Sequence, residues 1–398
     1  MNLVAWLDYL NQLPPLPQPE AIRILPRVIR EGWRQWSCPV ITITGTNGKG
    51  STATLVSAIL RAQGMRVACY TSPHLFDFRE RLRILGKICS ESAWRQAFEW
   101  VQAGQQPDEY YSFFDWVTLA ALYLCQQQAL DVLILEVGVG GRLDAVNAVD
   151  PDISVITGVA LDHTTWLGHD RESIGREKMG ICRVGRPLIC GDPAPPETVR
   201  AEAKRLQVQW YGLGEQFFVT SDHRNAHFHP HNMATAIQTA RCCQPQLTTD
   251  TIQRGIVRAV LPGRLERWHA PIPIVWDVAH NPEACAYSAS VLSSGKRPKR
   301  RYALFSMLND KLIQASLQAL THVVDEWHVF PLDTVRAGSS EQLAEAFLNV
   351  KIRNVIYYDT PDAAVAALHA LYQPGDEWLV TGSFHTVAVV RQLVVGMT

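Results

Sequence analysis

The chain has 398 residues, of which 37 are basic and 38 are acidic, and its formal net charge is −1. This balance gives no reason to expect attraction to nucleic acid or to an anionic membrane, and the length exceeds what one hydrophobic core usually fills. We therefore expect two or three domains. The nine cysteines include no CxxC pair, which argues against a disulfide framework and against a thiolate zinc site.

The N-terminal region is expected to be helical and has no features of an export signal. An amphipathic helix is predicted over residues 3–13, followed by a proline-rich segment at 14–19 and a second helix. A basic segment followed by an apolar core and a cleavage site is absent, and no apolar run approaches the ~20 residues that span a bilayer. Together with the cysteine usage, these features predict a soluble, cytoplasmic protein without membrane or nucleic-acid partners.

The next segment has the pattern of a strand, a glycine-rich loop and a helix. A strand predicted over residues 40–44 leads into the run TGTNGKGST and a helix over 51–63. Glycines let main-chain N–H groups approach phosphate oxygens, the helix N-terminus adds positive potential, Lys49 supplies a cation, and the Ser51 hydroxyl can ligate Mg²⁺. The run therefore predicts a phosphate-binding loop. Its spacing differs from GxxxxGK[ST] because Gly50 separates Lys49 from Ser51, and a simple glycine-rich turn is the alternative.

Further apolar runs predict a sheet around this loop. Strands are expected at residues 66–70, 132–137 and 153–159. The last two are short, rich in Val and Ile, and apolar on both alternating faces, as strands covered on both sides should be. This pattern predicts a doubly wound α/β domain, in which ligands collect at the carboxyl ends of the strands.

Titratable side chains follow two of these strands. Glu136 ends an otherwise apolar strand, where a carboxylate suits Mg²⁺ near phosphates; pairing with Arg142 or with a backbone amide is the alternative. Asp162 and His163 are expected at the end of the third strand, at the same edge of the sheet, with a purely structural histidine as the alternative. Lys178 lies in a charged helical segment, a pattern that by itself favours a surface position.

The pattern changes after residue 260. An irregular polar hairpin at 216–229 and helices at 232–242 and 249–260 precede a break in the run LPGR. Strands alternating with helices are predicted beyond it, at residues 274–278, 302–305, 326–330, 354–358 and 378–381. This alternation predicts a second, smaller nucleotide-fold domain.

Eight motifs occur in an order that resembles a known family. They are GTNGKGS, TSPHLFDFRERLRI, LEVGVGGRLDAVN, ALDHTTWLG, IGREKMGI, LPGRLE, DVAHNPEA and GSFHTVAVV. The chain resembles the dihydrofolate synthase/folylpolyglutamate synthase family of the Mur ligase superfamily over residues 3–390. The resemblance implies an α/β fold: a Mur-ligase-like P-loop ATPase domain with a mostly parallel, doubly wound sheet and a pterin site at 1–262, and a smaller Rossmann-like glutamate-ligase domain at 263–398.

The resemblance also implies the residues of an ATP and metal site. The implied ATP-binding residues are Gly45, Thr46, Asn47, Gly48, Lys49, Gly50, Ser51, Asn232, Arg264 and Asp277. The implied Mg²⁺ ligands are Ser51, Ser72, Glu136, His163 and Lys178. Lys178 matches a lysine that becomes carbamylated, which turns a cation into an anionic oxygen ligand; CO₂ reacts with the neutral amine, which burial favours. The implied catalytic residues are Lys49, His163, Lys178 and His280.

Substrate-binding residues follow from the same resemblance. For the pterin it implies Ser112, Phe114 and Asp144, since an aromatic face can stack on a flat heterocycle and a carboxylate can accept its N–H bonds. Aromatic residues at such spacing are also typical of a core. For glutamate it implies His280 and Ser383, with a helix-capping Ser383 as the structural alternative.

The implied reaction is ATP-dependent ligation of L-glutamate to dihydropteroate through an acyl phosphate, with extension of folate polyglutamate chains as a second activity. The expected partners are dihydropteroate or a reduced folate, L-glutamate and ATP, and a monomer is expected. Segments 14–19 and 216–229, and Leu312 in place of a usual Asp, depart from the family and leave polyglutamylation open. The alternatives are a peptidoglycan-type Mur ligase, which ordinarily has an additional N-terminal domain, and a non-catalytic nucleotide-dependent binding protein.

Overall fold

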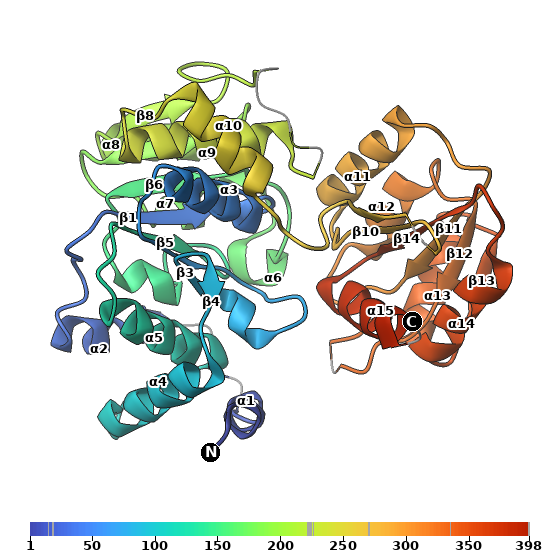
Figure 1. Cartoon of the computed structure of the whole chain (residues 1–398), viewed down its shortest axis with the longest axis horizontal. Helices are drawn as coiled ribbons and strands as arrows, with labels where there is room; N and C mark the ends of the chain where they lie inside the picture. The colour runs from blue at the N-terminus through green and yellow to red at the C-terminus, as the bar shows by residue number, and fades with distance from the viewer. Residues whose placement is uncertain are drawn as a thin grey trace. The chain divides into compact units, whose positions relative to one another are not determined.

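The chain forms two compact units, Met1–Val260 (unit 1) and Leu261–Thr398 (unit 2). The structure is a computed structural model and describes residues 1–14, 16–17, 20–220, 225, 227–269, 271–334 and 336–396. Each unit has its own β-sheet with helices around it (Figure 1). The predicted proline-rich segment at 14–19 and the predicted hairpin at 216–229 lie partly outside the described residues.

The sheet of unit 1 is mostly parallel. Among the described residues, eight strands form it in the order β4-β3-β2-β5-β1-β6-β7-β8, and the pairs β2/β3 and β3/β4 at one edge are antiparallel. The bounds are β1 Val40–Thr44, β2 Val67–Tyr70, β3 Leu82–Ile84, β4 Lys87–Ile88, β5 Val132–Glu136, β6 Ile153–Ile156, β7 Pro187–Cys190 and β8 Gln209–Gly212. The central strands β1, β5 and β6 are buried along their whole length, because helices cover both faces of the sheet.

Two groups of helices cover this sheet. On one face α3 packs against α9 and α10 (Figure 1), and the backbone of Ile59 comes within 2.5 Å of the place that a Cβ at Gly255 would take. On the other face α1, α4, α5, α7 and α8 contribute to one hydrophobic core. The bounds are α1 Leu3–Asn11, α2 Leu25–Arg30, α3 Lys49–Ala62, η1 Phe78–Arg81, α4 Glu91–Gly104, α5 Phe113–Gln126, η2 Ala145–Ala148, α6 Thr164–Leu167, α7 Arg171–Met179, α8 Glu197–Arg205, α9 Pro230–Cys243 and α10 Thr249–Arg258.

Unit 2 has a smaller sheet of the same kind. Among the described residues, six strands follow the order β13-β12-β11-β14-β10-β9, and all pairs except β9/β10 are parallel. The strand bounds are β9 Glu266–Trp268, β10 Ile274–Trp276, β11 Arg301–Phe305, β12 Glu326–Val329, β13 Val355–Tyr357 and β14 Glu377–Thr381. The helices are α11 Pro282–Ser294, α12 Ile313–Leu320, α13 Ser340–Asn349, α14 Pro361–Leu371 and α15 Phe384–Gly396.

This architecture confirms the predicted fold class of a doubly wound, mostly parallel α/β domain followed by a smaller nucleotide-fold domain. The strand predicted at 153–159 is too long, since β6 ends at Ile156. Beyond it the backbone pairs with the phosphate loop: the carbonyl of Gly158 accepts from the N–H of Thr46 (2.9 Å), and the Thr157 hydroxyl donates to the carbonyl of Asn47 (2.6 Å).

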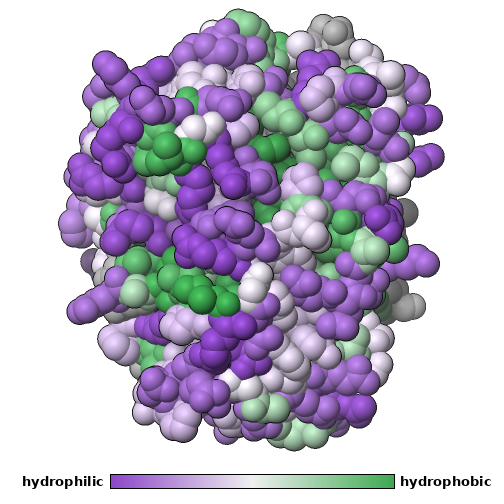
Figure 2. Space-filling view, turned by 90° about the vertical axis from the view of Figure 1, so that its left-hand side faces the viewer, coloured by the Kyte–Doolittle hydropathy of each residue, from purple (hydrophilic) through white to green (hydrophobic). Residues whose placement is uncertain are grey.

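All nine cysteines are free thiols. Within the described part of the chain, no helix combines the length and the apolar character needed to cross a bilayer. The face of unit 1 turned to the viewer in Figure 2 is mostly hydrophilic, and its hydrophobic residues form separate patches. Scattered apolar side chains of this kind are normal on a protein surface.

Candidate active site

The loop between β1 and α3 is packed so tightly that two of its glycines cannot be replaced without strain. Gly45 and Gly48 have positive φ angles, +151° and +84°. A Cβ at Gly45 would lie 1.8 Å from Oγ1 of Thr157, and one at Gly48 would lie 2.3 Å from Oδ1 of Asn232. Glycine is therefore required at both positions, and the side chain of Asn232, from the first turn of α9, lies directly against the loop.

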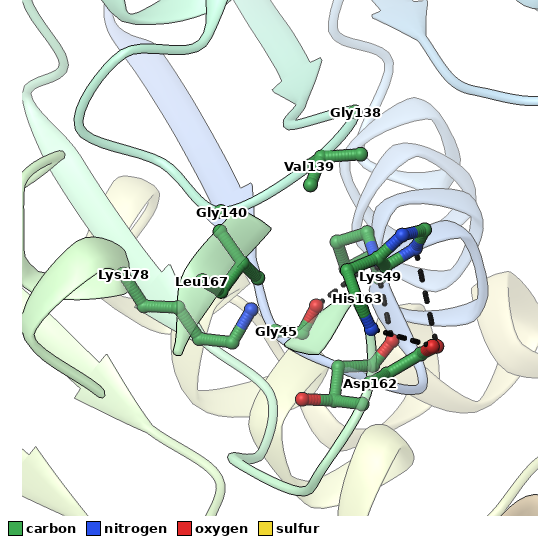
Figure 3. Close-up of a pocket in the computed structure, with 10 residues that line it drawn as sticks. Gly45, Lys49, Gly138, Val139, Gly140, Asp162, His163, Leu167 and Lys178 are labelled. Carbon is green, nitrogen blue, oxygen red and sulfur yellow. Dashed lines mark hydrogen bonds and ion pairs between the residues drawn. The ribbon is translucent and has the colours of Figure 1, made fainter. Parts of the chain in front are cut away.

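A pocket opens beside this loop (Figure 3). Lys49 Nζ donates to the carbonyl oxygens of Gly45 (2.9 Å) and Thr46 (3.3 Å), so its ammonium group is held at the mouth of the loop. The side chain of Lys178 points into the same pocket toward Gly45. The lining residues come from four segments of unit 1: Gly45, Thr46, Lys49, Gly138, Val139, Gly140, Asp162, His163, Leu167 and Lys178.

Glu136 lies at the end of β5 next to the phosphate loop. It is only 3% exposed, and its Oε2 is 3.4 Å from the place of a Cβ at Gly50. The backbone N–H of Ser72 donates to the same oxygen (2.9 Å), whereas Arg142 forms its ion pair with Glu177 (2.9 Å). The alternative that paired Glu136 with a backbone amide is thus observed, and no ion pair joins it to Arg142 in the described structure.

Asp162 and His163 reach the pocket from a loop, not from a strand end as predicted. They lie between β6 and α6, and His163 has a left-handed backbone with φ +49°. Nε2 of His163 is 4.0 Å from Oδ2 of Asp162, and both side chains lie beside Lys49 (Figure 3). The prediction that they face the same edge of the sheet as the phosphate loop is therefore met, although the local structure differs.

Lys178 is buried, so the surface position favoured by its charged helical segment is wrong. Its side chain on α7 is only 2% exposed. Burial, together with the charge of Lys49, lowers the pKa of Lys178 to about 7. A substantial share of its amine is then neutral at neutral pH, which is the form that reacts with CO₂.

The oxygen donors around the loop fit a hard divalent cation. Ser51 is buried in the first turn of α3, Glu136 faces Gly50, and Ser72 is bonded to Glu136. No three His, Cys, Asp or Glu side chains come together as a metal site within the described residues. Only two of the predicted ligands, Glu136 and His163, are residues of these four types. The absence of a group of three therefore does not test the predicted ligand set. Mg²⁺ usually combines one or two carboxylates with water and phosphate oxygens.

The predicted pterin residues lie near the segment that follows β5. A Cβ at Gly138 would lie 2.9 Å from Cζ of Phe114 and 3.2 Å from Oδ2 of Asp144, so these two side chains are neighbours. Asp144 accepts from the N–H groups of Val139 (3.0 Å) and Val146 (3.1 Å), and burial raises its pKa to about 7. Ser112 instead caps α5.

The Ser112 cap is a complete capping box. The Ser112 hydroxyl accepts from the N–H of Asp115 (3.2 Å), whose carboxylate accepts from the N–H of Ser112 (2.9 Å). The sequence analysis did not predict this role of Ser112 as the N-cap of α5.

The sequence analysis also missed Thr157, whose hydroxyl donates to the backbone of the phosphate loop. The signal that could have identified it is its position directly after a central parallel strand.

The four candidate residues of unit 2 are Arg264, Asp277, His280 and Ser383. Asp277 and His280 follow β10, Ser383 follows β14, and Arg264 precedes β9. Cζ of Arg264 lies 5.0 Å from the ring centre of Phe384, and the ring of His280 lies 5.9 Å from it. Asp277 is buried, which raises its pKa, and it accepts from the hydroxyl of Ser288. The Ser383 hydroxyl accepts from the N–H of Thr386 (2.9 Å) at the start of α15, which is the capping role expected as its structural alternative.

Comparisons with known proteins agree with this fold and site. The family model of the Mur ligase middle domain matches residues 43–229, and that of the Mur ligase glutamate ligase domain matches residues 263–384. Both units therefore have the domains of a Mur ligase.

The relatives define the branch of this class. The dihydrofolate synthase/folylpolyglutamate synthase of Escherichia coli strain K12 is 39% identical over 98% of this chain and 95% of its own. The structure of E. coli FolC in complex with DHPP and ADP is similar over 100% of this chain and 98% of its own, with a TM-score of 0.92 and 37% identity. A bifunctional folylpolyglutamate synthase/dihydrofolate synthase with Mn, AMPPNP and L-glutamate bound has a TM-score of 0.91 and 36% identity, over 99% and 98% of the chains. The chain belongs to the dihydrofolate synthase/folylpolyglutamate synthase family, which confirms the resemblance found in the sequence.

Proposed function

We propose that this protein is an ATP-dependent ligase that joins L-glutamate to dihydropteroate and also extends folate polyglutamate chains. The observation that carries the proposal is Lys178, which is buried in the pocket of the phosphate loop although its sequence pattern favours the surface. A buried amine is unfavourable for folding unless it has a role there. The full-length relatives named for both activities support the same reaction.

In this proposal, unit 1 binds ATP through Gly45–Ser51 and Asn232. Lys49 and the first turn of α3 neutralise phosphate charge. For Arg264 and Asp277 of unit 2 we also propose a role in nucleotide binding. The ADP and AMPPNP in the related structures support a nucleotide ligand.

The metal we propose is Mg²⁺, with Ser51, Ser72, Glu136, His163 and Lys178 as its ligands and the manganese of a related structure as support. When bound, the ion would supply charge neutralisation for the phosphates. We further propose that Lys178 is carbamylated, because burial keeps a share of its amine neutral and a carbamate would add an anionic oxygen donor.

The proposed reaction has two steps. A carboxylate oxygen of the acceptor attacks the γ-phosphorus of ATP, which gives an acyl phosphate and ADP. The α-amine of glutamate then attacks the acyl carbon and displaces phosphate, so that an amide forms. The chain's own contribution is to hold the reacting groups together, neutralise charge through Lys49, and keep water away from the acyl phosphate.

For the acceptor we propose Phe114 and Asp144 as the pterin-binding pair, with Ser112 at the start of the same helix. The DHPP in the E. coli FolC structure supports a pterin ligand. His280 and Ser383 of unit 2 are the proposed glutamate site, and the L-glutamate in a related structure supports this substrate. We place the protein in the cytoplasm as a monomer; its nine free thiols support a reducing compartment.

One assay tests the proposal. ADP release is measured with ATP, Mg²⁺ and glutamate, while dihydropteroate, tetrahydrofolate or a UDP-muramyl acceptor is added in turn. We expect turnover with dihydropteroate and a folate product with one added glutamate by mass spectrometry. Turnover only with the UDP-muramyl acceptor would favour a peptidoglycan-type ligase, and ADP release that no acceptor stimulates would favour a nucleotide-dependent binding protein.

A further inference from the structure

Unit 1 contains a buried arginine that forms no salt bridge with a carboxylate of the described residues. Three of the described arginines are almost fully buried: Arg27, Arg81 and Arg301. Arg27 forms an ion pair with Glu31 (2.9 Å) and Arg301 forms one with Glu377 (2.8 Å). Arg81, which is 8% exposed, forms no ion pair with a carboxylate of the described residues. Because buried charges in proteins are normally paired, this exception requires a reason.

The side chains in contact with Arg81 are uncharged, and Glu136 is a carboxylate whose charge acts on it without forming a salt bridge. Its Nε donates to Nδ1 of His74 (2.9 Å), so that imidazole nitrogen carries no proton. Its Cζ lies 5.4 Å from the ring centre of Phe113 and 5.9 Å from that of Phe78, and the Tyr70 hydroxyl is a further neighbour. Burial lowers the pKa of Arg81, but a guanidinium group stays protonated in proteins. Within the described residues, no carboxylate accepts a hydrogen bond from its terminal NH₂ groups.

Short backbone links join Arg81 to the phosphate side of the site. The carbonyl of Arg81 accepts from the N–H of Thr71 (2.8 Å), which pairs the start of β3 with the end of β2. The next residue, Ser72, donates its N–H to Glu136 (2.9 Å). Glu136 in turn lies 3.4 Å from the place of a Cβ at Gly50 in the phosphate loop. Three contacts, with one peptide bond between Thr71 and Ser72, thus connect Arg81 to the loop.

The aromatic contacts of Arg81 join it to the proposed pterin side. Phe113, over whose ring the guanidinium lies, is the first residue of α5, and Phe114 is the second. The ring of Phe114 lies 6.1 Å from that of Tyr70, the other neighbour of Arg81. The guanidinium group of Arg81 is therefore linked to the residues proposed for the pterin through Phe113 and Tyr70, and to those proposed for the phosphates through the charge of Glu136.

We propose that Arg81 binds the carboxylate group of the acceptor substrate and positions it for attack on the terminal phosphate, an inference that rests on the proposed ligase function. Dihydropteroate carries a flat heterocycle at one end and an aryl carboxylate at the other. When the heterocycle is beside Phe114, the carboxylate must reach toward the phosphates, and Arg81 is linked to both sides through Tyr70 and Glu136. A planar guanidinium matches a carboxylate with parallel N–H donors, and the rings of Phe113 and Phe78 hold its plane.

This role also solves a charge problem. The acceptor carboxylate has to approach a triphosphate and Glu136, which are all negative, so like charges oppose the complex. Arg81 would compensate the charge of the carboxylate before reaction, while a lone pair on one carboxylate oxygen stays available to attack the γ-phosphorus. Arg81 then acts as a substrate-positioning residue, and its removal should affect the carboxylate end of the acceptor more than the pterin end.

The test compares two ligands that differ only in this group. Dissociation constants of dihydropteroate and of its carboxamide are measured in the presence of AMPPNP and Mg²⁺. In Arg81→Gln we expect affinity for dihydropteroate to fall by roughly tenfold or more, the size of a charged hydrogen bond. Affinity for the carboxamide should stay within about twofold of the wild-type value.

The matched control is Arg79→Gln. Arg79 is two residues away and forms its ion pair with Asp77 (2.6 Å) at a partly exposed position. We expect this variant to leave both dissociation constants unchanged. If Arg81→Gln loses its cooperative thermal unfolding, Arg81→Lys replaces it, because lysine keeps the charge but not the fork; a severalfold loss of the carboxylate preference is then expected.

Two outcomes are distinguishable. A folded Arg81 variant that keeps the wild-type preference for carboxylate over carboxamide overturns the role of Arg81, whatever its turnover. A wild-type protein whose ADP release no pterin carboxylate stimulates overturns the proposed ligase function instead. A merely structural role of Arg81 would weaken both ligands equally and would lower the thermal midpoint, and this result also contradicts the proposal.

Discussion

At the scale of single residues, Lys178 is the position where burial opposes folding most directly. Burial and the charge of Lys49 lower its folded pKa to about 7, from the ordinary lysine value of 10.5. Between these two values the unfolded chain binds one more proton than the folded one, so the stability of the wild type rises with pH across this window. Below pH 7 both states are protonated and the destabilisation is complete. Lys178 therefore weakens the fold at neutral pH.

Replacing this lysine by methionine should stabilise the protein and abolish its activity. For Lys178→Met we expect a free energy of unfolding higher by about 1–3 kcal/mol at pH 7, and a difference from wild type that shrinks toward pH 10. Acceptor-dependent ADP release should fall by about 100-fold or more, since a charged group at the reaction centre is lost. The measurements are thermal unfolding from pH 6 to pH 10 in CO₂-free buffer and ADP release.

Lys204→Met is the control for this variant, because Lys204 is exposed on α8. It should change neither stability nor turnover. A Lys178→Met protein that is less stable than wild type at pH 7 would contradict the destabilising effect of the buried lysine, and one that remains fully active would contradict its proposed role in the reaction.

The same residue marks the limit of sequence reasoning about the site. The order of motifs leads to Lys49, Glu136, His163 and Lys178, and the structure brings Lys49, His163 and Lys178 to one pocket. The burial of Lys178 was not predictable from its helix, because it depends on a contact far away in sequence. The glycine-rich segment after β5 approaches α7 so closely that a Cβ at Gly141 would lie 2.9 Å from the carbonyl oxygen of Glu177.

At the scale of elements, the helix α3 after the phosphate loop has a glycine with a left-handed backbone just beyond each of its ends. Gly48 precedes α3 with φ +84°, and Gly64 follows it with φ +91°. Both positions strain any L side chain, but their surroundings differ. Gly48 faces the side chain of Asn232, whereas no atom lies within 4 Å of a Cβ at Gly64. Substitutions at Gly64 should therefore report the effect of backbone strain alone, whereas substitutions at Gly48 should also disturb the nucleotide site.

For Gly48→Ala we expect a KM for ATP raised by about tenfold or more and a loss of stability of about 1–3 kcal/mol, from strain plus the clash with Asn232. For Gly64→Ala we expect a loss of about 1 kcal/mol with an unchanged KM for ATP. Steady-state kinetics and thermal unfolding of both variants provide the comparison. Equal effects of the two substitutions on the KM for ATP would show that the loop conformation is not what binds the nucleotide.

Central and edge elements differed in how well the sequence predicted them. The strand predicted at 40–44 matches β1, and that at 132–137 ends one residue beyond β5, because strands buried on both faces have continuous apolar runs. Five strands were not predicted: β3, β4, β7, β8 and β9. All of them except β7 are short and partly exposed, whereas β7 is a mostly buried strand of four residues. The end of the strand predicted at 153–159 was misplaced because the residues after Ile156 bond to the phosphate loop instead of continuing the strand.

At the scale of the whole molecule, the candidate residues are divided between the two units. Those proposed for phosphate, metal and pterin lie in unit 1, and Arg264, Asp277, His280 and Ser383 lie in unit 2. Gly263 is bonded into unit 2, since its N–H donates to Glu266 (2.9 Å) and its carbonyl accepts from Val278 (2.9 Å). The connection between the units is therefore the short stretch that precedes Gly263. The proposed reaction requires both sets of residues, so it depends on this connection.

Lengthening the connection should slow the reaction without unfolding either unit. We expect a flexible insertion of about eight Gly and Ser residues between Val260 and Leu261 to lower acceptor-dependent turnover by roughly 3- to 10-fold, because it dilutes one set of residues relative to the other. Thermal unfolding should be unchanged, since each unit keeps its own core. The same insertion between Gln127 and Gln128, in the exposed turn after α5, should leave turnover unchanged. Wild-type turnover with the insertion after Val260 would mean that one unit alone carries the reaction, which contradicts the division of roles proposed for the two units.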